Sequence, residues 1–245
     1  MRCNADRLIE ALIAVELMEM QKQAAEKKEE LRQKAEVFVV TISRDFGSMG
    51  KSVAQLLADT LEVRCCDRFI LQQVARRAHV DEELVRVLDE HVSKIDGHWW
   101  QHLLHKDAFT YEDYYHYLVK TVLSISRTGG VIIGRGANLI LGEKAFRVRI
   151  NGSVEQCAKR VAKREQISTA EGIERVREVN DERAEYMRKL YDTDINDTSA
   201  YDLMLNSDRY DRVQMVDLIL DAMEKAGYKL PDDARKSLSV LAETN

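Results

Sequence analysis

The chain has 245 residues, of which 45% are hydrophobic and 32% are charged, and its formal net charge is −5 at pH 7. These values are typical of one globular α/β domain, alone or with a small appendage, which folds without a disulfide or a structural metal. The negative charge argues against nucleic-acid binding by bulk attraction, and no run of about 18 apolar residues could span a membrane.

Cysteine usage and the first residues of the chain predict a cytoplasmic protein. No metal-ligand spacing connects the four cysteines, Cys3, Cys65, Cys66 and Cys157. Adjacent cysteines rarely pair with each other, so we interpret all four as reduced thiols. The apolar stretch 8–20 lacks the uncharged centre of a signal peptide, because it contains Glu10, Glu16 and Glu19.

Residues 1–36 are predicted to be a helical extension that precedes the main domain. One long helix over 5–36 carries an apolar stripe of Leu8, Leu12 and Val15, and after Glu19 it becomes almost wholly charged. The stripe fades before three heptads accumulate. Two interpretations stay open: a solvated extension, or a helix that forms a homodimer or binds another partner.

From Val37 onward the pattern alternates between strands and helices. Strands are predicted at 37–42, 63–66, 131–133, 146–150 and 201–205. Helices are predicted at 51–61, 69–79, 81–94 and 111–127, from Ser153, over 168–191 and from Asp211 to Gly227. Ser153 with Gln156, and Ser168 with Glu171, have the spacing of capping boxes. Five strands separated by helices predict a mostly parallel sheet with right-handed crossovers. Residues 229–245 are expected to form a short C-terminal tail.

The segment after the first strand has the features of a phosphate-binding loop. A buried strand leads into a glycine-bearing loop, and the next helix opens with a lysine and a serine. Backbone N–H groups and the helix N-terminus attract phosphates, and glycines let the chain approach the oxygens. We expect ATP phosphates to be bound by Gly47, Ser48, Met49, Gly50, Lys51 and Ser52. Lys51 would reach the β- and γ-phosphates, and the Ser52 hydroxyl would bind Mg²⁺.

The loop departs from the pattern G-x-x-x-x-G-K-[ST] at its first glycine, where Asp45 stands. Gly47 can supply the missing flexibility two residues later. A carboxylate beside the polyphosphate would repel it unless Mg²⁺ or Arg44 compensates the charge.

Five segments, in order and spacing, resemble the cytidylate kinase-like family. They are TISRDFGSMG (41–50), CDRFI (66–70), VIIGRGAN (131–138), DERAEY (181–186) and YDLMLN (201–206). The resemblance covers about residues 37–225. It implies a P-loop nucleoside monophosphate kinase domain over 37–228: a parallel five-stranded sheet flanked by helices, a helical acceptor-binding insert at about 67–128, and a helical lid at about 160–190.

The resemblance also implies roles for individual residues. The acceptor would be bound by Asp67, Arg68 and Arg135, of which Arg135 follows the third strand and would hold the acceptor phosphate. Lid arginines would neutralise the phosphoryl group in transfer, and the candidates are Arg160, Arg164, Arg183 and Arg188. Phosphoryl transfer needs positioning and charge neutralisation more than a base.

The implied activity is a nucleotide kinase reaction with Mg²⁺, in which ATP phosphorylates a nucleoside monophosphate. Arg68 and Phe69 replace the family's small residues after Asp67, so the base-reading pocket is not carried over. Asn180 and Met187 stand where a phosphate-binding arginine is expected. Two alternatives therefore remain: a catalytically weak nucleotide-binding regulatory module, and a kinase of another small metabolite.

Histidine and tyrosine clusters in the insert are interpreted as packing faces. His98, His102 and His105 share a helical face, but no nearby cysteine completes a metal site. The tyrosines at 111, 114, 115 and 117 have the spacing of an amphipathic helix.

Overall fold

The computed structural model describes residues 37–91 and 109–243, and the predicted N-terminal helix and the three clustered histidines lie outside them. The strands are β1 (Val39–Arg44), β2 (Cys65–Cys66), β3 (Gly130–Ile133), β4 (Phe146–Asn151) and β5 (Leu203–Asn206). The helices are α2 (Gly50–Thr60), α3 (Arg68–Ala78), α4 (Glu82–His91), α6 (Tyr111–Ile125), α7 (Ala137–Leu141), α8 (Val154–Glu165), α9 (Thr169–Tyr191), α10 (Arg212–Lys225) and α11 (Ala234–Glu243), with short 3₁₀ turns η2 (Gly142–Lys144) and η3 (Thr198–Ala200).

The strands form one five-stranded sheet in the order β2-β3-β1-β4-β5, and every pairing is parallel. This confirms the predicted α/β fold. Strand β1 lies in the centre, where Thr41 is level with Ile132 on one side and with Arg147 on the other. From β1 the chain first adds β3 and β2 on one side of the sheet and then crosses to add β4 and β5 on the other side. Open α/β sheets bind ligands at the carboxyl ends of their strands near such a change of side.

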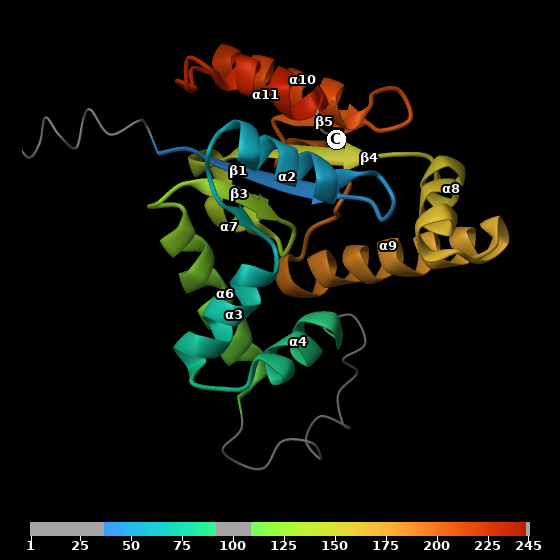
Figure 1. Cartoon of the computed structure of the whole chain (residues 1–245). Helices are drawn as coiled ribbons and strands as arrows, with labels where there is room; N and C mark the ends of the chain where they lie inside the picture. The colour runs from blue at the N-terminus through green and yellow to red at the C-terminus, as the bar shows by residue number, and fades with distance from the viewer. Residues whose placement is uncertain (1–36, 92–108, 244–245) are drawn as a thin grey trace, which may run out of the picture. The chain divides into compact units, whose positions relative to one another are not determined.

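Helices cover both faces of the sheet, which explains the continuous apolar runs of its strands. Val40 and Ile42 pack with α2, α10 and α11, whereas Val39 packs with α3, α6 and α7 on the opposite face. Figure 1 shows α10 and α11 above the strands, α2 across them, and α3 and α6 below them. Because successive side chains point to opposite faces, each strand contributes to both cores.

Helices α8 and α9 form a hairpin and pack on each other beyond the carboxyl ends of the strands (Figure 1). They approach closely at Gly172, where an added Cβ would lie 2.8 Å from the carbonyl oxygen of Ala158. The predicted capping box of Ser168 and Glu171 is confirmed at the start of α9. Ser153 caps α8 through the Gln156 N–H, but its own N–H donates to Asp208, so the second box is only half formed.

The end of the chain differs from the expected tail. Residues 234–243 form α11, which packs on α2 and α10 and buries Ala234 and Leu238 in the core. Ala234, Leu238 and Leu241 recur at helical spacing, a periodicity that the expectation of a tail overlooked. Val37 is 53% exposed and precedes β1, so the first strand begins two residues later than predicted.

The cysteines in the described part of the chain, Cys65, Cys66 and Cys157, are all free thiols. Burial raises the pKa of Cys65 and of Cys157 to about 11, so both stay protonated at neutral pH. None of the described helices has the length and apolar character that a membrane span requires.

Candidate active site

The loop between β1 and α2 has the backbone shape of an anion-binding turn. Gly47 and Met49 adopt left-handed conformations with φ of 84° and 63°, and Met49 directly precedes the first turn of α2. No described side chain caps that turn, so its N–H groups remain available to an anion. Gly47 also approaches α8 closely, because a Cβ there would lie 2.6 Å from the carbonyl oxygen of Cys157.

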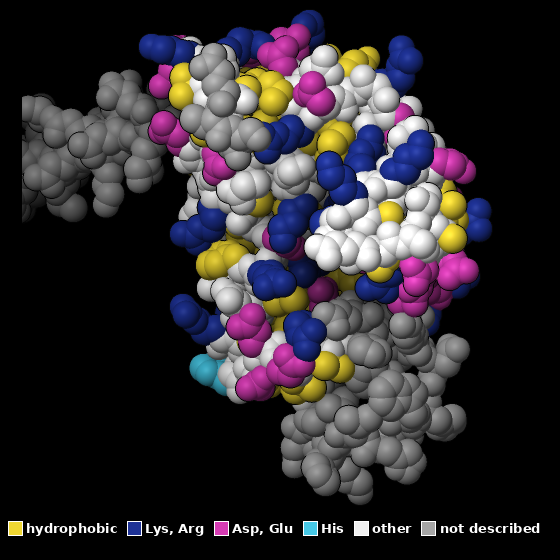
Figure 2. All heavy atoms as spheres, turned by 45° about the vertical axis from the view of Figure 1, so that its right-hand side comes forward, with side chains coloured by type: hydrophobic (Ala, Val, Ile, Leu, Met, Phe, Trp, Pro, Cys, Tyr) yellow, Lys and Arg dark blue, Asp and Glu magenta, His cyan; other side chains and the backbone are white. Residues whose placement is uncertain are grey.

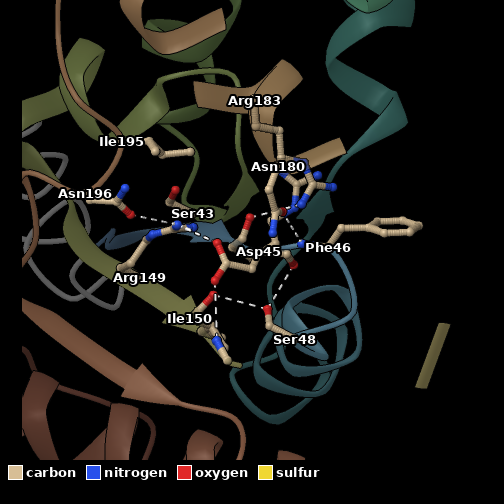
Figure 3. A network of polar contacts seen from close by, with 12 residues as sticks. Ser43, Asp45, Phe46, Ser48, Arg149, Ile150, Asn180, Arg183, Ile195 and Asn196 are labelled. Carbon is tan, nitrogen blue, oxygen red and sulfur yellow. Dashed lines mark hydrogen bonds and ion pairs between the residues drawn. The ribbon is translucent and has the colours of Figure 1, made fainter. Parts of the chain in front are cut away.

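Asp45, which stands in place of the first glycine, points toward β4 (Figure 3). Its Oδ1 lies 2.5 Å from Nη2 of Arg149, and its Oδ2 accepts a hydrogen bond of 3.3 Å from the Gly152 N–H. The Arg149 side chain is only 3% exposed. The charge of Asp45 is therefore compensated by Arg149, a partner that the sequence analysis did not name.

Arg149 is a site residue that the sequence analysis missed. It occupies a buried position in a central strand, where a charged residue rarely lies without a partner. Its Nη2 also donates to Asn196 at 3.4 Å, while its Nε and Nη1 have no hydrogen-bond partner among the described residues. An arginine inside the apolar run of the fourth strand was the available signal.

A chain of ion pairs links the phosphate loop to the end of β3. Nζ of Lys51 lies 3.3 Å from Asp67, whose other oxygen lies 3.5 Å from Nη1 of Arg135. Arg135 donates two hydrogen bonds to the Asp89 carboxylate, from Nε at 3.1 Å and from Nη2 at 3.0 Å. The Tyr114 hydroxyl donates to the same carboxylate at 2.6 Å. Asp89 and Tyr114 come from the predicted insert and were not foreseen as site residues.

Electrostatics in this chain of ion pairs favours the charged forms. Burial alone would raise the pKa of Asp67, but the Arg135, Arg44 and Lys51 cations outweigh it and hold that pKa below its usual range. Burial likewise opposes the charge of Arg135, and the Asp89 carboxylate more than offsets this and raises the pKa of Arg135.

A cavity of about 380 Å³ opens beside this network. Three arginines line it, Arg44, Arg135 and Arg183, together with Asp89, Glu182, Tyr186 and Met187. Burial and the neighbouring cations Arg183 and Arg135 lower the pKa of Arg44 to about 9, and burial lowers the pKa of Arg183 to about 10. Figure 2 shows Lys and Arg side chains gathered around a hollow on the face that carries α8 and α9.

The other predicted arginines lie in different surroundings. Arg160 donates to the Gly47 carbonyl at 3.3 Å and to the Ser207 carbonyl at 2.6 Å, so it braces the phosphate loop from α8. Arg164 is exposed and lies over the Phe46 ring at 5.0 Å. Arg188 is exposed and pairs with Glu185, and Arg68 is exposed at the start of α3. Neither Arg188 nor Arg68 lines the cavity.

Helix α9 contacts the phosphate loop through two hydrogen bonds. Oδ1 of Asn180 accepts from the Phe46 N–H at 2.7 Å (Figure 3), and Nη1 of Arg183 donates to the Arg44 carbonyl at 3.0 Å. The Phe46 ring packs in the core of the α8–α9 hairpin, within cation–π distance of Arg164 and Arg183. The predicted lid thus lies against the phosphate loop in this structure.

Ser52 has the chemistry of a magnesium ligand. Its Oγ donates a hydrogen bond of 2.8 Å to the Met49 carbonyl, so the lone pairs of the hydroxyl oxygen remain free to coordinate a cation. Among the described residues no cluster of three His, Cys, Asp or Glu side chains could hold a metal. A magnesium ion here would therefore depend on phosphate oxygens and water for its other ligands.

Comparisons with known proteins agree with this fold. The sequence profile of the cytidylate kinase-like family matches residues 39–209. A cytidylate kinase of Pyrococcus horikoshii is 32% identical over 89 residues, which is 36% of this chain and 46% of that enzyme. A cytidylate kinase of Methanothrix thermoacetophila is 31% identical over 101 residues, 41% of this chain and 58% of that enzyme. The chain thus spans about half the length of the relatives it matches.

Among solved structures, an uncharacterized protein from Eubacterium ventriosum has a similar fold. The two chains superpose with a TM-score of 0.59 at 20% sequence identity, over 77% of this chain and 98% of the other. At this level of identity the likeness concerns the fold alone.

Proposed function

Because the chain belongs to the cytidylate kinase-like family, we propose that it is an ATP-dependent phosphotransferase that passes the γ-phosphoryl group of ATP to the phosphate of a nucleoside monophosphate. The observation that carries the proposal is the direct link between the phosphate loop and the arginine-lined cavity. Two ion pairs connect these regions: Lys51 lies 3.3 Å from Asp67, and Asp67 lies 3.5 Å from Arg135. Donor and acceptor phosphates bound on either side of this link would lie close enough for transfer.

In this proposal the residues of the phosphate loop bind ATP and Mg²⁺, and those of the cavity act on the group in transfer. The first turn of α2 and the loop N–H groups bind the phosphates of ATP, and Lys51 neutralises their charge. Ser52 would hold Mg²⁺, which supplies further charge neutralisation on the phosphate oxygens. Arg183, at the cavity wall, neutralises the group in transfer.

A screen of ATP consumption against all ribo- and deoxyribonucleoside monophosphates tests this function. Release of ADP that depends on one class of monophosphate supports the nucleotide kinase. Consumption only with other small phosphorylated or hydroxylated metabolites would keep the phosphotransfer and reassign the acceptor. Absence of consumption with every acceptor would contradict the proposal.

Lys51→Ala is expected to lower phosphotransfer by roughly 10²–10³-fold, by analogy with the loss of one charge-stabilising donor. The Lys51 side chain is 75% exposed, and the partly buried Asp67 keeps its pair with Arg135, so the thermal midpoint Tm should stay close to that of the wild type. Initial rates and thermal melts measure the two effects. Lys225→Ala, which removes an exposed lysine from the end of α10, is the matched control. Wild-type rates in the Lys51 variant would exclude the assigned role.

One contact favours the second candidate, a nucleotide-binding regulatory module. Asn180 already accepts the Phe46 N–H, a loop group that a phosphate would otherwise use. We expect Asn180→Ala to tighten ATP binding by roughly 2–10-fold, the value of one hydrogen bond, as measured by calorimetry against the exposed control Arg177→Ala. Weaker binding in the Asn180 variant would show that the contact belongs to the nucleotide-bound form. Tighter binding without ATP consumption would favour the regulatory module.

A further inference from the structure

The three arginines of the cavity differ in how their charges are compensated. Arg135 donates from Nε and Nη2 to Asp89, and from Nη1 to Asp67. Its guanidinium is therefore engaged on all three nitrogens by the protein itself. The guanidinium of Arg44, in contrast, makes no hydrogen bond and no ion pair with any residue in the described parts of the chain.

Two close approaches place the Arg44 side chain between the phosphate loop and the end of β3. A Cβ added at Gly50 would lie 2.5 Å from Cβ of Arg44, so the stem runs along the first turn of α2. A Cβ added at Gly134 would lie 2.1 Å from Nη1 of Arg44, so the guanidinium rests on the turn that follows β3. Glycines at both positions leave the room that this path requires.

Arg183 brings a second cation to the same place. Its Nη1 donates to the carbonyl oxygen of Arg44, and both side chains line the cavity. Asp45, an acid close to Arg183, is already paired with Arg149. The depressed pKa values of Arg44 and Arg183 report the same situation, because burial and adjacent like charges both oppose the cation. Neighbouring cations held this way cost stability until an anion neutralises them.

We propose that Arg44 and Arg183 together bind a phosphate dianion in this cavity, and that Arg135 positions Asp67 and Asp89 instead of holding that phosphate itself. Paired guanidinium groups present several charge-assisted donors, which suit the oxygens of a phosphate group. A catalytic role for this site rests on the proposed kinase function. The γ-phosphoryl group of ATP and the phosphate of the acceptor share the required chemistry.

The first test uses inorganic phosphate as the probe, titrated calorimetrically into the protein with and without saturating ADP. Wild type is expected to bind phosphate while ADP occupies the phosphate loop. Arg44→Met and Arg183→Met should each weaken this binding roughly 10–100-fold, the loss of a hydrogen bond to a charged group. Arg175→Met is the matched control, because Arg175 is an exposed arginine of α9 that pairs with Glu178.

Thermal melts without phosphate keep the test independent of misfolding. Burial and the cations Arg183 and Arg135 outweigh the attraction of Asp67 and Asp89 for Arg44, so Tm of Arg44→Met should equal that of wild type or rise by about 2–4 °C. Arg44→Lys, which retains a charge, should recover part of the phosphate affinity. A lower Tm, together with phosphate binding that Arg44→Lys does not recover, would show that Arg44 is structural and would overturn the proposal.

Substrate binding then separates the two sources of the phosphate. If Arg44 contacts the γ-phosphoryl group, Arg44→Met weakens a non-hydrolysable ATP analogue and leaves ADP affinity unchanged. If it contacts the acceptor, affinity for the monophosphate falls and that for the analogue holds. Either result supports the site.

The site and the kinase function can fail separately. Phosphate binding that depends on Arg44, in a protein that consumes no ATP with any acceptor, would keep the site and reject the kinase. Kinase activity in wild type, with phosphate binding unchanged in Arg44→Met, would reject the site and keep the kinase. Wild type that binds no phosphate also overturns the site.

Discussion

Asp45→Gly, which introduces the first glycine of the phosphate-loop pattern, is expected to lower the free energy of unfolding by about 3–5 kcal/mol. The change removes the carboxylate that lies 2.5 Å from Arg149 and leaves a guanidinium that is 3% exposed without its counter-ion. Nε and Nη1 of Arg149 already have no partner among the described residues, and Asn196, which accepts from Nη2 at 3.4 Å, carries no charge that could replace the Asp45 carboxylate. Urea denaturation monitored by circular dichroism measures the loss.

The double variant Asp45→Gly/Arg149→Met is the matched control. Methionine fills much of the volume of the arginine stem and brings no buried charge, so most of the lost stability should return. Full stability in the single variant would show that water enters and solvates Arg149. A gain in ATP affinity from Asp45→Gly would show that the acid repels nucleotide, whereas the geometry predicts no gain because Asp45 points toward β4.

Arg135→Ala is expected to cost about 3–5 kcal/mol as well, because it leaves Asp89 and Asp67 without the cation between them. We also expect acceptor affinity to fall and ATP affinity to hold, since Asp89 borders the cavity and the turn that carries Arg135 follows β3, whereas the phosphate loop follows β1. Arg135→Lys keeps a charge but cannot donate the two parallel hydrogen bonds to Asp89, so we expect an intermediate loss of stability. Wild-type stability in the alanine variant would contradict the proposed positioning role.

The loss of stability in Arg135→Ala should depend on pH. In the wild type the pKa of Asp67 is lowered, so its contribution is fully present above the unfolded value of about 3.9 and disappears as pH falls through the folded value. Without Arg135 that contribution shrinks. The difference between wild type and variant should therefore be greatest near neutral pH and should narrow below about pH 4. A difference that grows on acidification would exclude this explanation.

Local patterns were sufficient to predict the scaffold of the site. The β-branched run before Ser43, the glycines after it and the helical period from Lys51 all lie within one short segment. The start of α9 followed from the serine and glutamate of its capping box, a contact between near neighbours.

The compensation of charge could not be predicted in the same way. Asp45 and Arg149 are 104 positions apart, and Arg135 and Asp89 are 46 apart, so these pairs arise only when the sheet and the insert come together. Helical spacing likewise does not tell which arginine of α9 faces the cavity, and Arg183 does whereas Arg188 lies in solvent. Ion pairs between residues far apart in the sequence therefore determine which of the described arginines are left without a carboxylate partner and can bind an anionic ligand.

The match to the family ends at residue 209, but the interior of the protein continues beyond it. Met215, Ile219 and Leu220 of α10 and Leu238 of α11 belong to the same core as Leu57, on the helix that follows the phosphate loop. An expressed fragment trimmed to the matching segment would uncover this apolar side of α2 and is expected to aggregate. The smallest unit of this chain fit for nucleotide-binding assays therefore reaches through residue 243.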